Sequence, residues 1–292
     1  MPRNADELIE LLDLERLDDD LFRGQQMPST LPRVFGGQAA AQALVAASRT
    51  VDPSYAVHSL HSYFLQPGDT GAPTIFDVDN LRDGRSFATR RVQAIQHGRP
   101  IYAMTANFQR AEEGFDHQEP MPQVISPEEA LDARAASRAA DPDRDSSRDS
   151  EWDVVDLRYV GTSADGRLPE DGEETARQRF WLRVSSALPD DPFWHVAAFT
   201  YLSDMTLMGA AFAPHGVRMG SPEVMIASLD HSVWFHRPFR ADEWWLYDQV
   251  SPAASGSRGL VLAKVYSQDG RLCATVAQEA LLRRRTGSGG PA

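Results

Sequence analysis

The chain has 292 residues and a formal net charge of −13, with 42% hydrophobic and 24% charged residues. These values are typical of a soluble globular protein of one large or two medium domains, and the negative charge disfavours nucleic acid as a partner because two polyanions repel each other. The first residues lack a basic stretch followed by an apolar core, and no apolar run approaches the roughly 20 residues that span a bilayer, so we expect a cytoplasmic protein that does not enter the membrane.

The N-terminal segment, residues 5–22, has the pattern of a short helix followed by a lead-in strand. Small apolar residues then recur at helical spacing over residues 38–49 and predict a helix that starts at a turn of Gly36 and Gly37. Free amide groups and the positive end of the dipole at such a start can hold an oxyanion. Gly36 and Gly37 are therefore candidate oxyanion residues.

Runs of β-branched and aromatic residues follow and predict four strands, at residues 57–66, 74–81, 86–96 and 100–109. The short segments between them contain Gly, Asp and Pro and have the composition of tight turns. A helix followed by such a meander indicates an α+β fold rather than a βαβ arrangement. Arg82 and Arg85, in one of the turns, are candidates for binding phosphate.

Residues 111–176 differ from the rest of the chain. Their low hydrophobicity and the acidic run 141–153 predict an acidic, partly mobile linker region. Residues 246–281 repeat the pattern of residues 74–109 with an offset of about 172 positions, which indicates two copies of one unit. The predicted divisions are an N-terminal unit, the linker region, a C-terminal unit and a tail: residues 1–110, 111–176, 177–285 and 286–292.

The stretch 201–235 holds the strongest candidates for chemistry. Asp204 precedes a short apolar stretch that ends at Pro214, which predicts a helix with Asp204 as its N-cap. The run 224–236 is rich in Val, Ile, Phe and Trp and predicts a strand, with Ser228 near its start. The carboxylate and the hydroxyl form a candidate reactive pair.

No metal site is expected. Cys273 is the one cysteine in the sequence, which excludes an internal disulfide and a multi-cysteine site, and its apolar neighbours predict a buried thiol. His58 and His61 lie three residues apart and His231 and His236 five apart, so on strands each pair points to opposite faces and cannot share a metal. The same alternation separates His231 from the acid and the hydroxyl that flank it, which excludes a catalytic triad there.

Six short motifs occur in order along the chain: RVFGGQ (33–38), HSLHSYFL (58–65), LRDGRSF (81–87), SDMT (203–206), LDHSVWFHRPF (229–239) and VAQE (276–279). Together they resemble the acyl-CoA thioesterase II family over about residues 8–110 and 150–284. The resemblance implies a double hotdog, an α+β fold of two fused helix-plus-antiparallel-sheet units in one chain. It also implies hydrolysis of fatty acyl-CoA to free fatty acid and coenzyme A, without metal or covalent intermediate, and with no cofactor beyond the coenzyme A of the substrate.

The resemblance also assigns residues. In the family, an Asp at the second hotdog helix, a Thr or Ser on the next strand and a Gln on the last strand hold the attacking water, and the matching positions here are Asp204, Ser228 and Gln278. His58 is a further candidate for substrate binding, beside the glycine and arginine candidates given above. The family habit, together with the exposed sheet edges of hotdog units, implies a homo-oligomer, a dimer or a tetramer.

Other interpretations remain open at this point. Asp204 is explained equally well as a helix cap, and Gln278 as a structural hydrogen-bonding group in a core. A hotdog protein that binds acyl-CoA as a sensor or scaffold without hydrolysing it is the alternative function. A hotdog hydratase would carry Asp and His on one helical segment, and His215, which follows the break at Pro214, does not fit that pattern.

Overall fold

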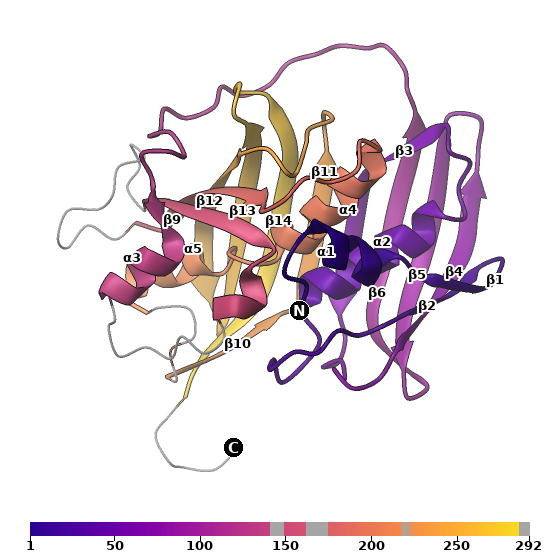
Figure 1. The fold of residues 1–292 in the computed structure, drawn as a ribbon, viewed down its shortest axis with the longest axis horizontal. Helices are drawn as coiled ribbons and strands as arrows, with labels where there is room; N and C mark the ends of the chain where they lie inside the picture. The colour runs from indigo at the N-terminus through magenta and orange to yellow at the C-terminus, as the bar shows by residue number, and fades with distance from the viewer. Residues whose placement is uncertain (141–148, 162–174, 218–220, 222, 286–292) are drawn as a thin grey trace.

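The computed structural model describes residues 1–140, 149–161, 175–217, 221 and 223–285 (Figure 1). Within them, the strands pair antiparallel in a single sheet of the order β1-β2-β4-β5-β6-β3-β11-β14-β13-β12-β9-β8-β7, and β10 pairs with β14 beside this path. None of the helices in this part of the chain is both long and apolar enough to cross a membrane.

The N-terminal half of the sheet follows the predicted pattern closely. Its elements are α1 (Ala5–Leu12), β1 (Glu15–Asp18), β2 (Leu21–Gly24), α2 (Gly36–Ser48), β3 (Tyr55–Phe64), β4 (Thr74–Asp83), β5 (Phe87–Gln96) and β6 (Arg99–Arg110). The four predicted meander strands are confirmed to within two residues at each end, because turn residues mark their limits in the sequence. The predicted lead-in strand is a short hairpin, β1 and β2.

The segment between the halves contains ordered elements. They are β7 (Leu131–Asp132), α3 (Ala133–Ala140), η1 (Asp149–Trp152) and β8 (Val155–Gly161). Because β8 pairs with the first strand of the C-terminal half, that half of the sheet begins before residue 177. Residues 141–148, the first part of the acidic run in the linker region expected to be partly mobile, lie outside the described residues.

The C-terminal half repeats the strand order of the first. Its elements are β9 (Arg177–Val184), α4 (Pro192–Ser203), α5 (Gly209–Phe212), η2 (Ala213–His215), β10 (Val224–Ser228), β11 (Asp230–Phe235), β12 (Trp245–Ser255), β13 (Arg258–Ser267) and β14 (Leu272–Arg284). The order β9-β12-β13-β14-β11 mirrors β2-β4-β5-β6-β3, and the halves join where β3 pairs with β11. Gly98 and Gly270, matched by the repeat, both have positive φ, of 70° and 86°, in the equivalent hairpin turns.

Helices α2 and α4 pack against each other at the centre of the molecule (Figure 1). Nearly every residue of α2 is buried, as expected of a helix that is apolar on all sides. Its small residues allow close approach: a Cβ atom on Gly37 would lie 2.1 Å from the backbone oxygen of Tyr201 in α4. The two helices therefore meet backbone to backbone at the start of α2 and the end of α4.

Two local predictions are wrong. Asp204 is the C-cap of α4, not the N-cap of the next helix, because Asp191 caps α4 at its other end by accepting a hydrogen bond from Phe193 N at 2.9 Å, and Pro192 fills the first turn. The predicted strand 224–236 is also broken at Leu229 into β10 and β11. Both differences fall at the candidate site.

Candidate active site

Asp204 lies where the two halves meet. The backbone amide of Gly37, in the first turn of α2, lies close enough to the carboxylate to lower its pKa. A Cβ atom on Gly36 would lie 2.6 Å from Asp204 Oδ2 and 2.8 Å from the ring of Phe64, so a larger residue here would displace one of these side chains. The Gly-Gly sequence at the start of α2 thus lets the carboxylate approach the helix end, whose dipole favours negative charge.

The structure brings Asp204, Ser228 and Gln278 together. Gln278 Nε2 donates to Asp204 Oδ1 and to Ser228 Oγ, each at 2.8 Å. The Ser228 hydroxyl donates to Asp204 Oδ1 over a longer distance of 3.3 Å. Three groups from α4, β10 and β14 therefore form one hydrogen-bonded cluster, with Gln278 almost fully buried and the other two partly accessible.

His231 belongs to the same cluster, although the sequence analysis did not group it with these three residues. Its ring is fully buried, with Nδ1 2.5 Å from Gln278 Oε1 and Nε2 2.8 Å from Ser203 Oγ. The reason is a bulge: Ser228 pairs with Ala280 but Ser232 pairs with Ala277, so one extra residue lies on this side of the ladder. The bulge shifts the alternation, and residues three apart, Ser228 and His231, point to the same cluster.

The hydrogen bonds fix the orientation of Gln278 and the tautomer of His231. Because Nε2 of Gln278 donates to two oxygen atoms, its Oε1 faces the histidine, and Nδ1 of His231 must carry the proton that it donates to this oxygen. Burial lowers the pKa of His231, partly offset by the nearby charge of Asp204. The lowered pKa favours the neutral, Nδ1-protonated form, in which Nε2 accepts from the Ser203 hydroxyl.

Burial also governs Asp204. It raises the pKa of this carboxyl above its ordinary value, while His231 and the hydrogen bonds from Gln278, Ser228 and Gly37 act in the opposite direction. The result is a carboxylate with a raised proton affinity whose donors hold it in one orientation. Such a group is suited to accept a proton from a bound molecule near neutral pH.

The remaining sequence candidates lie elsewhere. His58 is on β3, four positions or about 13 Å along the strand from Ser62, the neighbour of His231, and its ring packs edge-on against Phe87. Its Nε2 is buried without a hydrogen-bond partner among the described residues, and burial lowers its pKa. No contact links it to Asp204, so its role in substrate binding remains a prediction.

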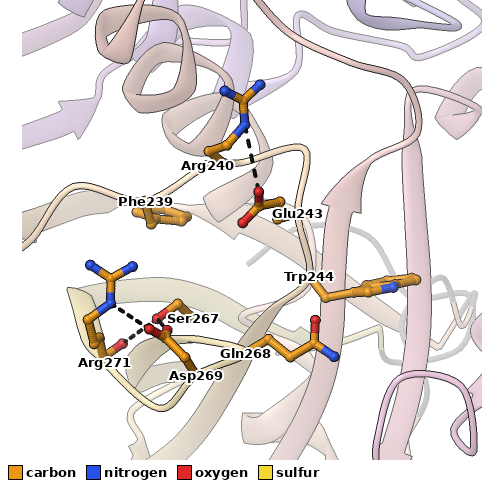
Figure 2. Close-up of a pocket in the computed structure, with 8 residues that line it drawn as sticks. All are labelled: Phe239, Arg240, Glu243, Trp244, Ser267, Gln268, Asp269 and Arg271. Carbon is orange, nitrogen blue, oxygen red and sulfur yellow. Dashed lines mark hydrogen bonds and ion pairs between the residues drawn. The ribbon is translucent and has the colours of Figure 1, made fainter. Parts of the chain in front are cut away.

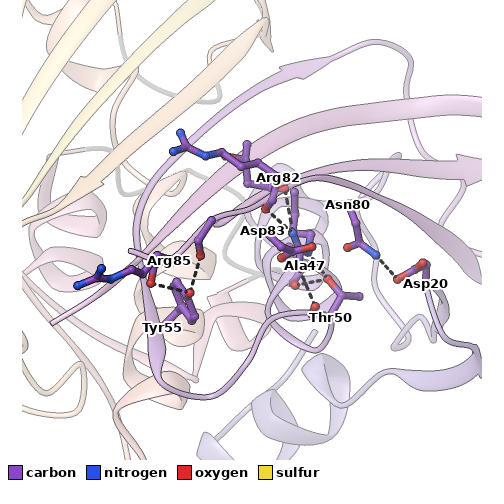
Figure 3. Close-up of polar contacts among 11 residues, drawn as sticks. Asp20, Ala47, Thr50, Tyr55, Asn80, Arg82, Asp83 and Arg85 are labelled. Atoms are coloured by element: carbon purple, nitrogen blue, oxygen red, sulfur yellow. Dashed lines mark hydrogen bonds and ion pairs between the residues drawn. The ribbon is translucent and has the colours of Figure 1, made fainter. Parts of the chain in front are cut away.

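Arg82 lies near the end of β4, and Arg85 lies in the turn between β4 and β5 (Figure 3). Their carbonyl groups are bonded, Arg82 O by Arg90 Nη1 at 3.0 Å and Arg85 O by the Tyr55 hydroxyl at 3.1 Å, while their side chains extend away from this cluster (Figure 3). The strand register places Arg82 directly across the sheet from Ser59 on β3. Three strand spacings separate the two residues, a distance of about 14 Å. The structure does not bring either arginine to Asp204.

Comparison with known proteins finds a match to an acyl-CoA thioesterase family model in each half of the chain. Residues 157–281 match the family model described as acyl-CoA thioesterase, and residues 25–109 match the acyl-CoA thioesterase N-terminal domain. The chain is 40% identical to acyl-coenzyme A thioesterase 8 of Homo sapiens over 94% of its length and 88% of the relative's. It is 38% identical to acyl-CoA thioesterase 2 of Haemophilus influenzae, covering 94% and 96% of the two chains.

Solved structures resemble the whole chain. The acyl-CoA thioesterase II TesB2 from Mycobacterium marinum superposes with a TM-score of 0.81 at 44% identity, covering 96% of this chain and 99% of that one. A protein with a hot dog fold from Alicyclobacillus acidocaldarius gives a TM-score of 0.77 at 22% identity, covering 96% and 98%. At that level of identity, the second likeness shows the fold alone.

Proposed function

Because the chain belongs to the acyl-CoA thioesterase II family, we propose that it hydrolyses fatty acyl-CoA with a water molecule held by Asp204, Ser228 and Gln278. The observation that carries this proposal is the hydrogen-bonded cluster of these three side chains around one carboxylate oxygen. The 3.3 Å contact between Ser228 and Asp204 is long for a hydroxyl donor. In the proposed complex the attacking water lies beside this contact, accepts from the Ser228 hydroxyl and donates to Asp204 Oδ1.

The proposed reaction needs no covalent intermediate. Asp204 accepts a proton as the water oxygen bonds to the thioester carbonyl carbon, which gives a tetrahedral oxyanion. The carbon–sulfur bond then breaks, and the thiolate of coenzyme A leaves and takes up the proton from Asp204. A thiolate is a good leaving group, so positioning of the water supplies most of what the reaction requires.

The glycine candidates divide into two roles. The Gly37 amide acts on the Asp204 carboxylate and lowers its pKa, so we assign it to holding this group rather than to the predicted oxyanion role. The Gly36 amide makes no hydrogen bond to any residue that the structure describes, and we retain it as the oxyanion donor. A donor of this kind supplies roughly 3 kcal/mol in other enzymes.

The fold supports the same proposal. Two halves with the same strand order, each with a central helix, and the likeness to a hot dog protein support a double hotdog divided near residue 110. In this arrangement Asp204, Ser228 and Gln278 come from the C-terminal half, while Gly36 and Gly37 come from the N-terminal half. The site therefore requires both units in one chain.

The direct test is coenzyme A release from short, medium and long acyl-CoAs by the purified chain. We expect turnover of at least a subset of the panel, with release of thiol detected by a chromogenic disulfide reagent. If the chain binds acyl-CoA in calorimetry but releases no thiol from any member, the thioesterase proposal fails and the sensor or scaffold function replaces it.

His231 is expected to be a positioning residue. His231→Leu removes the donor to Gln278 Oε1 and frees the amide to rotate, so we expect kcat to fall about 10- to 100-fold with little change in KM. His231→Asn keeps an N–H near the position of Nδ1 and should restore part of the loss. Equal kcat for both variants, or a change confined to KM, would contradict this role.

A further inference from the structure

Two cavities occupy equivalent places in the two halves. One, of about 320 Å³, lies at the β3–β4 loop and the β5–β6 turn, where it is lined by Asp69, His97 and Arg99. The other, of about 200 Å³, lies at the β11–β12 loop and the β13–β14 turn (Figure 2). The repeat offset matches Arg99 of the first cavity to Arg271 of the second, and His97 to Asp269.

The cations of the second cavity are neutralised. Arg271 Nε lies 2.9 Å from Asp269 Oδ2, and Arg240 contacts Asp190, Asp242 and, at 3.9 Å, Glu243 (Figure 2). Each guanidinium therefore has its own carboxylate on or beside the cavity wall. An anionic ligand would have to displace these pairs, which makes this cavity a poor site for phosphate.

The first cavity has a different charge pattern. His97 stands where the other half has Asp269, and its Nε2 lies 2.9 Å from Asp69 Oδ2, so the one carboxylate of the cavity wall is engaged by histidine. The guanidinium of Arg99 is exposed and makes no hydrogen bond or ion pair with a residue in the described parts of the chain. Its positive charge is uncompensated in a chain of net charge −13.

A pair of neighbouring strands, β3 and β6, leads from the Asp204 cluster to the first cavity. Phe64, whose ring reaches the Gly36 position beside Asp204, pairs with Tyr102 on β6, and Arg99 lies three residues further along that strand, about 10 Å from Tyr102. The wall between is fixed by the N–H groups of residues 65 and 66, which both donate to Ile101 O. The repeat matches Ala106 of the N-terminal half to Gln278 of the C-terminal half, so the N-terminal half has no equivalent of this carboxamide at that position.

We propose that Arg99 in this cavity binds a phosphate group of the coenzyme A moiety, while the equivalent cavity at Arg271 does not. The proposal rests on the proposed function, because it assumes a thioester at Asp204. The pantetheine arm leads from that thioester to the diphosphate and the 3′-phosphate of the nucleotide, and the path past Phe64 and Tyr102 to Arg99 gives the direction in which it would run. A guanidinium can bind phosphate through two parallel hydrogen bonds, which suits this role.

The test compares Arg99→Ala with the matched control Arg271→Ala on two thioesters of the same acyl chain, acyl-CoA and acyl-pantetheine, which carries no phosphate. For Arg99→Ala we expect KM for acyl-CoA to rise about 10- to 100-fold with kcat nearly unchanged, and no change in KM for acyl-pantetheine. Arg99→Lys should recover part of the affinity, and Arg271→Ala should match wild type on both thioesters.

The substrates also identify the phosphate. If the 3′-phosphate is the ligand, wild type should lose affinity for the dephospho-CoA thioester as Arg99→Ala does for acyl-CoA; if the diphosphate is the ligand, Arg99→Ala should be impaired on both. An unchanged KM for acyl-CoA in Arg99→Ala, or an equal rise with acyl-pantetheine, would overturn the phosphate site while leaving hydrolysis intact. Failure of the proposed function is distinct, because wild type would then release thiol from neither thioester.

Discussion

Asp204→Asn is expected to lower kcat for acyl-CoA hydrolysis by at least about 100-fold, the size of effect that a positioned base supplies. The amide has the shape of the carboxylate and can still accept hydrogen bonds from Gln278 and Ser228, but it cannot take a proton from water. The measurement is thiol release under saturating substrate, beside circular dichroism to show that the variant is folded. Asp77→Asn is the matched control, because Asp77 is an exposed acid on β4 without a bonded partner among the described residues.

The same variant should be more stable than wild type at neutral pH. Burial raises the pKa of Asp204 in the folded state above its unfolded value of about 3.9. The protonated carboxyl therefore contributes its full stability to the fold below pH of about 3.9, and this contribution is lost as the pH rises through the folded pKa. Asparagine does not ionise, so Tm of Asp204→Asn should exceed that of wild type at pH 7 and the difference should shrink towards pH 4.

The pH dependence of wild-type activity should report the ionisation of Asp204. Because the proton acceptor must be ionised, kcat/KM should fall on the acid side with an apparent pKa above the ordinary aspartate value. Retention of activity in Asp204→Asn would remove this residue from the proposed mechanism. A lower Tm at pH 7 for the variant would show instead that the ionised carboxylate stabilises the fold through its hydrogen bonds.

Local patterns in the sequence were sufficient for the strands but not for the groups around Asp204. The meander of residues 57–109 is set by alternation and turn residues, which are local, and the structure follows it. The grouping of Ser228 and Gln278 with Asp204 came from a family resemblance, because the three positions are distant in sequence and only the folded chain brings them together.

The errors have identifiable physical causes. An Asp before apolar residues fits either end of a helix, and the stronger signal, Asp191 followed by Pro192, lay a full helix upstream. His231 was not grouped with Ser228 because strict alternation places residues three apart on opposite faces, and the structure has a bulge between these two residues. A bulge adds one residue without a distinctive composition, so its presence here depends on pairing with β14 rather than on local propensity.

Gly37→Ala is expected to produce the largest loss of stability among simple substitutions at this site. Its Cβ would lie 2.1 Å from the backbone oxygen of Tyr201, and because this oxygen belongs to the backbone of α4, α2 and α4 must move apart. We expect the free energy of unfolding to fall by about 3 kcal/mol or more, the upper range for overpacking. Gly114→Ala is the matched control, since nothing lies within 4 Å of the added carbon there.

The separation of the helices should also affect catalysis. It would draw the Gly37 amide away from Asp204, so the folded fraction of Gly37→Ala should hydrolyse acyl-CoA more slowly than wild type. Urea unfolding followed by tryptophan fluorescence measures the first effect, and thiol release at a temperature well below the variant's Tm measures the second. A variant with wild-type stability would mean that α2 and α4 can separate at little cost in free energy. The close contact between these helices would then not be what holds the two halves of the chain in place around the carboxylate.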